Sequence, residues 1–127
     1  MISLSLPAGH LTVVALAAHP DDVEIACGGT LLGLAERGGV YVHLLTLTGT
    51  PEREAEAREA AEAFLPAATS SHFAGLPDGR LPEHWGAVKG ALHALARRVP
   101  APDVVLAPRV DDAHQDHRLV GELAPTV

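Results

Sequence analysis

Two clusters of histidine and aspartate lie far apart in this sequence, and each follows an apolar run. The first cluster, at 18–24, has the sequence AHPDDVE and follows the apolar run 11–17. The second, at 111–117, has the sequence DDAHQDH and follows the run 103–107 and Pro108. Imidazoles and carboxylates bind metal ions and transfer protons. The two clusters are therefore candidates for a single catalytic metal site.

The position of these clusters in the fold decides whether they can meet. Apolar runs of this kind are typical of strands buried in a parallel sheet. In open α/β folds, ligands bind at the carboxyl ends of such strands, and both clusters follow one. We therefore expect His19, Asp22 and His117 to converge there. Two imidazoles, one carboxylate and a free position are typical of a catalytic zinc site, whereas structural sites are closed by four ligands, usually including cysteine.

The rest of the sequence predicts the elements that position the clusters. Strands are predicted at 11–17, 40–47, 70–74 and 103–107, and helices after the first cluster as far as Gly38-Gly39, at 52–65, at 83–98 and from about His117. The strand at 40–47 is apolar almost throughout, so we expect it to be buried on both faces. The helix at 83–98 should pack through one apolar face, made of Trp85, Val88, Leu92, Leu95 and Val99. This alternation indicates an α/β, Rossmann-like three-layer fold with a mostly parallel sheet.

Composition bounds the class of protein. A chain of 127 residues suits one domain, 1–127, and its net charge of −7 argues against nucleic-acid binding, which needs a basic face. The single cysteine, Cys27, excludes an internal disulfide, and we interpret it as a small buried residue beneath the site rather than as a ligand. No apolar run reaches membrane-spanning length, and the amino terminus lacks the basic residues of a secretory signal. A cytoplasmic location is the default expectation, and the sequence does not decide whether the protein forms a homo-oligomer.

The two clusters together resemble the LmbE-like, or PIG-L, family of zinc-dependent de-N-acetylases. That family carries AHPDDxE after its first strand and an HxDH-type element after a later one, as at 18–24 and 114–117 here. GGTL at 28–31, RxxEAxxAA at 53–61 and LPDG at 76–79 match further family elements in the same order. HQDH replaces the frequent HPDH and keeps the ligands intact. The resemblance implies one zinc ion per chain, for which other divalent transition metals can substitute.

The resemblance also implies roles for individual residues. Asp21 is expected to act as the general base, and His114 as an acid or as a stabiliser of the oxyanion. Arg53 and Asp78 match residues that face the sugar. The alternatives are a helix-surface arginine paired with Glu56 or Glu59, and a turn aspartate. The remaining carboxylates are expected to support the ligands: Asp116 and Asp112 by orienting an imidazole, and Glu24 as a structural hydrogen-bond acceptor.

The implied reaction is hydrolysis of the N-acetyl group of an N-acetylglucosamine-containing small molecule or glycoconjugate, which releases acetate and a free amine. The sequence does not choose among thiol precursors, glycolipids and antibiotic sugars. Two alternatives stay open: another metal-dependent hydrolase, such as a phosphoesterase or an amidohydrolase, and a non-catalytic metal-binding module. Release of amine from an N-acetylglucosaminide, compared with release of phosphate from a phosphomonoester, separates the two enzymes.

The sequence stops soon after the second cluster, and Thr48 is followed almost at once by the helix at 52–65. Because the family's members are longer and often carry a loop there, we expect this chain to be partial. The C-terminal part and one active-site loop would be missing. An intact mass of the purified protein close to 13.2 kDa would contradict this expectation.

Overall fold

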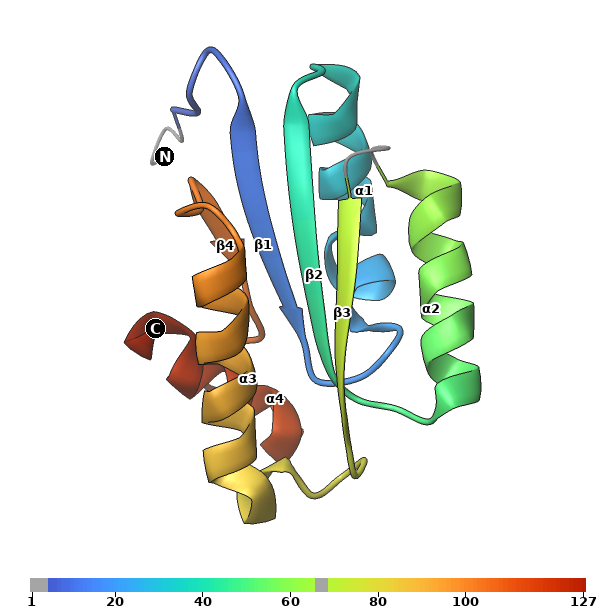
Figure 1. Ribbon diagram of the computed structural model, residues 1–127, viewed down its shortest axis with the longest axis vertical. Helices are drawn as coiled ribbons and strands as arrows, with labels where there is room; N and C mark the ends of the chain where they lie inside the picture. Colours follow the sequence, from blue (N-terminus) through green and yellow to red (C-terminus); the bar gives the residue numbers. More distant parts are fainter. Residues whose placement is uncertain (1–4, 66–68) are drawn as a thin grey trace.

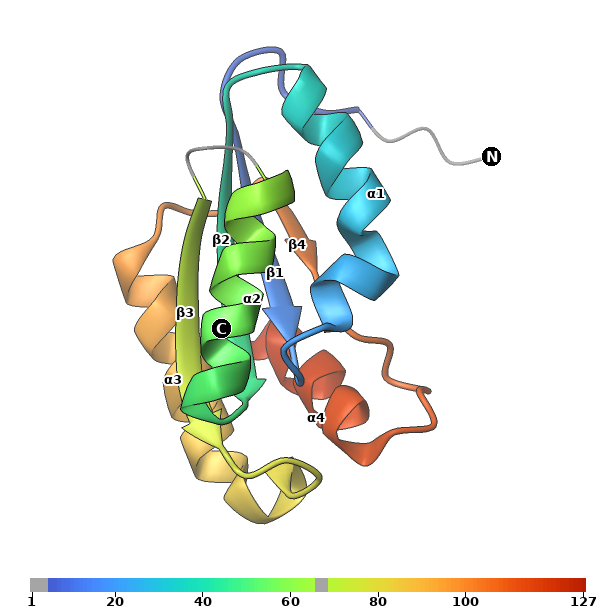
Figure 2. The ribbon, with the colours of Figure 1, turned by 90° about the vertical axis from the view of Figure 1, so that its right-hand side faces the viewer.

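Four parallel strands form the central sheet of the computed structural model, which describes residues 5–65 and 69–127. The strands lie in the order β3-β2-β1-β4 and are β1 (Leu11–Ala17), β2 (Val40–Thr48), β3 (Thr69–Leu76) and β4 (Val104–Leu106). Helices cover both faces of the sheet (Figure 1): α1 (Asp22–Glu36), α2 (Pro51–Phe64), α3 (Trp85–Arg98) and α4 (Gln115–Leu123). Helices α1 and α2 lie on one side of the sheet, with α2 in front of the strands in Figure 2, and α3 lies on the other side. The predicted three-layer α/β fold is confirmed.

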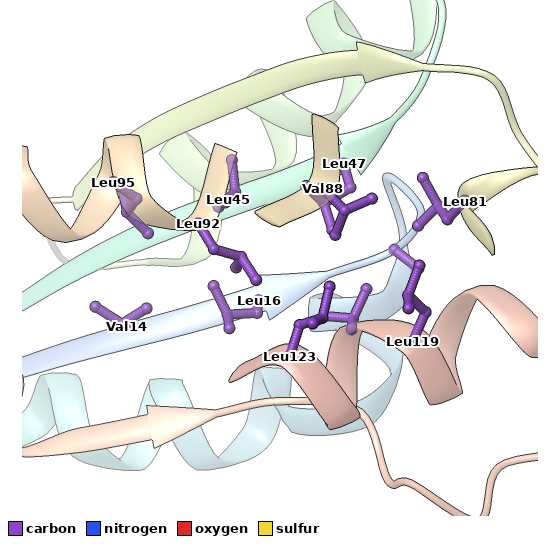
Figure 3. Packing of buried hydrophobic residues seen from close by; sticks show 12 residues of the cluster. Val14, Leu16, Leu45, Leu47, Leu81, Val88, Leu92, Leu95, Leu119 and Leu123 are labelled. Atoms are coloured by element: carbon purple, nitrogen blue, oxygen red, sulfur yellow. The ribbon is translucent and has the colours of Figure 1, made fainter. Parts of the chain in front are cut away.

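The core consists of two apolar clusters, one on each face of the sheet. Because successive side chains of a strand point to opposite faces, β1 contributes Val13 and Ala15 to the cluster beneath α1 and α2. The same strand contributes Val14 and Leu16 to the cluster beneath α3 and α4. Figure 3 shows this second cluster, in which leucines of β2, α3 and α4 meet above β1. The sheet is therefore fixed from both sides.

Local sequence signals set the ends of the helices. Helix α1 is followed by Gly38 and Gly39, with φ values of 72° and 66°, as the predicted C-cap requires. The Thr50 side chain caps α2 by accepting a hydrogen bond from the Arg53 backbone. The last helix begins at Gln115, two residues before the predicted start. Its cap is His114, a residue type that capping rules do not favour.

The structure corrects the predicted face of α3. Trp85 is 52% exposed, because it is the first residue of the helix and follows the 3₁₀ turn Leu81–His84. Leu81 from that turn is fully buried beside Val88 and Leu47, as Figure 3 shows. Val88, Leu92 and Leu95 are buried as predicted. Leu81, four residues before Trp85, therefore fills the place in the core that was predicted for the tryptophan.

The strands also differ from the prediction in detail. Strand β3 is longer than predicted, and β4 is shorter. Strand β2 is not buried on both faces along its whole length, because Tyr41 is exposed and His43 is half-buried. Within the described ranges, no helix has the length and apolar character needed to cross a membrane.

A close contact places α4 against the end of β4. A Cβ atom added to Gly121 would lie 2.4 Å from the carbonyl oxygen of Pro108, so only glycine fits at this point. The contact holds the second cluster next to the segment that follows β4. Since α4 begins at that cluster, this packing determines where His117 lies.

Candidate metal centre

The carboxyl end of β1 and the start of α4 bring the two clusters together. His19 Nδ1 lies 3.1 Å from His117 Nε2, which lies 3.1 Å from the Asp22 carboxylate. The remaining pair, His19 Nδ1 and Asp22, is 3.6 Å apart. Four ligands arranged tetrahedrally around a zinc ion, each about 2.0–2.2 Å from it, lie roughly 3.3–3.6 Å from one another. The two carboxylate oxygens of Asp22 divide these contacts, Oδ1 facing His117 and Oδ2 facing His19, so the two nitrogens and the carboxylate lie at separations close to those of three ligands of one ion.

The charges around His19 favour a cation. The hydrogen bond with Asp22 raises the pKa of His19 to about 9, against the opposing effect of burial, and Asp116 and Asp78 raise it further. Burial opposes ionisation of Asp22, but its hydrogen bonds with the side chain and backbone of His19 outweigh this and hold its pKa below the usual value. A metal ion that displaces the proton of His19 would meet the same carboxylates.

Each of the two imidazoles is held by a carboxylate through its second nitrogen. His117 Nδ1 lies 3.2 Å from Asp112, which leaves Nε2 directed towards His19 and Asp22. Hydrogen bonds from the His114 backbone and from His117 hold the pKa of Asp112 below its usual value. His19 Nε2 faces Asp116, at 3.3 Å, which leaves Nδ1 for the ion. Such contacts fix the tautomer and orientation of metal-binding histidines.

Asp116 is completely buried, and its hydrogen bonds join three parts of the site. It accepts hydrogen bonds from the backbone of Gly79 (2.9 Å) and of Leu81 (3.0 Å), besides its contact with His19. A buried polar group needs such hydrogen-bond partners, because burial removes it from water. Asp116 therefore links α4 to the turn that carries Asp78.

His114 has the geometry of a hydrogen-bond donor rather than of a ligand. The Asp116 backbone donates to its Nδ1 at 3.2 Å, so in the neutral ring the proton is on Nε2. Its ring centre lies 4.6 Å from that of His19 and 5.0 Å from that of His117. The three histidines are thus close enough to share one ion. To bind an ion through Nε2, however, the neutral ring would have to carry its proton on Nδ1 instead. Nδ1 already accepts a hydrogen bond, so it is not placed to carry that proton.

A cavity of about 530 Å³ lies beside the three histidines. Asp21 lines it and is more than half exposed, with Arg53 3.6 Å away. Arg53 also lies 3.0 Å from Glu56, and this ion pair is one of the alternatives predicted for it. Asp78 lies at the cavity wall, 78% exposed and 3.2 Å from His19. Arg53 and Asp78, the residues matched to sugar contacts, thus border the cavity beside Asp21, the residue expected to act as the base.

Two other predicted residues lie outside this cavity. Glu24 is half-buried on α1, and burial raises its pKa, as do the neighbouring Asp21 and Asp22. Cys27 is half-buried rather than fully buried, and burial raises the pKa of its thiol. It lines a second, mostly apolar cavity of about 620 Å³ between α1 and β4, which also reaches Asp22 and His117.

Sequence reasoning missed the residues that hold the backbone of the site. Thr48 donates a hydrogen bond to Ala18, and the Gly79 and Leu81 amides bind Asp116. Backbone amides leave no sequence signal. The one sequence signal for Thr48 was its position as a polar residue directly after the apolar strand 40–47.

Comparison with known proteins adds an independent line of evidence. A family model described as "PIG-L: GlcNAc-PI de-N-acetylase" matches residues 14–127. The Escherichia coli (strain K12) protein "Uncharacterized deacetylase YaiS" is 29% identical over 119 residues, which cover 85% of this chain and 63% of that protein. The match with the family model includes both histidine clusters.

Solved structures share the fold. The N,N'-diacetylchitobiose deacetylase of Pyrococcus horikoshii is 26% identical with a TM-score of 0.70, covering 89% of this chain and 47% of that one. GalB, the 4-carboxy-2-hydroxymuconate hydratase of Pseudomonas putida KT2440, is 24% identical with a TM-score of 0.73, covering 91% and 55%. The second likeness shows the fold alone. This chain spans less than two thirds of the length of each of these three relatives.

Proposed function

The chain belongs to the PIG-L family of GlcNAc-PI de-N-acetylases, and from this premise we propose that it hydrolyses an N-acetyl group. The substrate is an N-acetylglucosamine-containing small molecule or glycoconjugate, and the products are acetate and a free amine. One observation carries the proposal. The ring nitrogens of His19 and His117 lie 3.1 Å apart, and the Asp22 carboxylate lies 3.1 Å from His117 and 3.6 Å from His19, at the wall of a cavity that Asp21 and His114 also line.

In this proposal His19, Asp22 and His117 hold a zinc ion. Zinc supplies Lewis acidity, which lowers the pKa of water to about 7 and polarises a carbonyl. Asp112 and Asp116 accept hydrogen bonds from the second nitrogen of each ring and so direct the other nitrogen towards the ion.

Asp21 takes the proton from the attacking water, and the proton then passes to the nitrogen of the leaving amine as the C–N bond breaks. Its carboxylate lies next to Asp22 in the chain but is exposed in the cavity, where it is free to accept a proton. Arg53, 3.6 Å away, holds this carboxylate at the cavity wall. General bases act from within hydrogen-bond reach, and such contacts often shorten only when substrate is bound.

His114 donates a hydrogen bond from Nε2 to the oxyanion that forms on the acetyl carbonyl. The backbone hydrogen bond to Nδ1 supports this assignment, because in the neutral ring it leaves the proton on Nε2. A donor fixed in place before the reaction stabilises developing charge without reorganisation.

The polar cavity accepts the sugar. Its volume of about 530 Å³ is within the range of small-molecule sites. Arg53 and Asp78, at its wall, offer a hydrogen-bond donor and an acceptor for sugar hydroxyls.

The test combines metal analysis with a substrate screen. We expect the purified protein to contain one zinc ion and to release acetate from at least one N-acetylglucosaminide. His117→Ala should lose both metal and activity, while His93→Ala, which changes a half-buried histidine of α3, should keep both. Phosphate release from phosphomonoesters without acetate release would contradict the proposal, as would zinc binding without turnover of any amide by the full-length protein.

A further inference from the structure

Thr48 is a buried hydroxyl residue at the end of β2, next to the first metal-binding turn. Its side chain is 1% exposed. The hydroxyl donates to the carbonyl oxygen of Ala18 at 2.7 Å, and the Thr48 backbone N–H donates to the same oxygen at 2.9 Å. The paired residues of β1 and β2 end at Ala17 and Thr46, so these bonds lie just beyond the ladder.

The other side of the same peptide unit is also held. The Ala18 carbonyl and the His19 N–H belong to one planar group. The His19 N–H donates to the Asp22 carboxylate at 2.9 Å, and so does the Ala18 N–H. Thr48 and Asp22 therefore hold the peptide plane that precedes His19 from opposite ends.

The residue that directly follows β2 contacts the same turn. Gly49 has a φ of +148°, which side chains rarely adopt, and a Cβ atom there would lie 3.3 Å from Cγ of Pro20. Gly49 thus lets the end of β2 lie against the turn after His19. Thr48, the last residue of β2, therefore holds this turn through its hydroxyl, and Gly49 leaves room for it because it has no side chain.

We propose that Thr48 is a positioning residue for the metal site: its hydroxyl fixes the Ala18–His19 peptide and thereby the direction of the His19 side chain. The proposal rests on the proposed function in so far as His19 binds zinc. Loss of the hydroxyl leaves the Ala18 carbonyl with one hydrogen bond in place of two. The peptide plane then rotates more freely, and His19 Nδ1 is no longer held 3.1 Å from His117 Nε2.

Zinc affinity measured against a competing chelator tests this role. Thr48→Val removes the hydroxyl and keeps the branched shape, and we expect zinc to bind about 10–100-fold more weakly, as for other groups that orient metal ligands. Thr48→Ser keeps the hydroxyl and should bind zinc almost as tightly as the unchanged protein. Thr46→Val is the matched control, because Thr46 lies on the same strand and face and is 6% exposed. Urea unfolding of all three variants separates the loss of affinity from a loss of stability.

Amide hydrogen exchange of the metal-free protein gives a second readout. We expect the His19 N–H to exchange faster in Thr48→Val than in Thr46→Val, because the peptide plane is held at one end only. This measurement needs neither zinc nor substrate. It therefore tests the role of Thr48 even if the unchanged protein binds no zinc or hydrolyses no amide. Those two outcomes would count against the proposed function and not against the role of Thr48.

Should Thr48→Val fail to fold, Thr48→Ala replaces it, since it also removes the hydroxyl, and zinc should again bind more weakly. The proposal is overturned by a folded variant without the hydroxyl whose zinc affinity and His19 exchange equal those of Thr46→Val.

Discussion

At the scale of single residues, adjacent aspartates in the first cluster have separate tasks. Asp22 turns towards His19 and His117, and Asp21 remains exposed beside Arg53. We predict that Asp21→Asn keeps zinc but loses about 10²–10⁴-fold in kcat, since an amide accepts no proton from water. Metal analysis and acetate release measure the two properties. A near-normal rate would move the base to another residue, and Asp112 is the next candidate.

His114 allows a finer test, because a donor and an acid respond differently to substitution. His114→Ala should bind zinc but turn over slowly, with the loss in kcat rather than in KM. His114→Gln places an amide N–H near the position of Nε2, so it should recover part of the lost rate if the residue acts as a neutral donor. Equal rates for the two variants would instead indicate a proton transfer from His114. Loss of zinc in either would make His114 a ligand.

A histidine pair remote from this site predicts how stability depends on pH. His43 Nδ1 and His72 Nε2 lie 2.6 Å and 3.0 Å from the hydroxyl of Ser70. Burial lowers the pKa of both rings below the ordinary 6.5, and for His72 the neighbouring His43, Arg98 and Arg58 lower it further. The unfolded chain therefore binds more protons here as pH falls below about 6.5, and the free energy of unfolding falls with it.

The double variant His43→Gln, His72→Gln isolates this effect. Urea unfolding between about pH 7.5 and 5.5 should give a smaller loss of stability in the variant than in the unchanged protein. Equal pH dependence in the two proteins would contradict the prediction.

At the scale of elements, the position of α4 depends on one glycine. We predict that Gly121→Ala lowers the free energy of unfolding by about 1–3 kcal/mol, because its Cβ overlaps the Pro108 carbonyl and the helix must move. Zinc binding should weaken as well, since α4 carries His117. Gly33→Ala on α1 is the control: nothing lies within 4 Å of its added Cβ, and alanine should stabilise that helix by about 0.5–1 kcal/mol. Equal effects of the two substitutions on stability would contradict this account.

Elements were largely predictable where local chemistry decides their ends. The apolar run at 11–17 and the glycines at 38 and 39 give β1 and the end of α1 directly. Trp85 was placed wrongly because helical periodicity does not show which turn of the chain fills the core, and Leu81 from a 3₁₀ turn does so. The start of α4 was missed because its cap is a histidine held by the site itself.

The convergence of His19 and His117 was predictable because parallel strands end at one edge of a sheet. The contacts of Asp116 with Gly79 and Leu81 were not, because they depend on how a loop packs rather than on residue types.

At the scale of the whole molecule, β4 forms one edge of the sheet (Figure 1), and among the described residues it pairs with β1 alone. Val105 on this strand is 48% exposed and lines the apolar cavities on either side of it. Exposed edge strands with apolar side chains promote association. We predict that this 127-residue chain self-associates with rising concentration and that Val105→Lys reduces the association. Sedimentation measures it, with Leu32→Lys, an exposed site outside both cavities, as the control.

The two ligating histidines are 98 positions apart in the chain. An ion bound by both would close a loop that includes most of the sequence, and bringing the ends of so long a loop together costs the unfolded chain considerable entropy. In the folded protein the sheet and α4 already hold the two histidines close together. The ion should therefore bind only after α4 has docked. Acquisition of the metal would then follow the docking of α4, and its release would accompany the detachment of that helix.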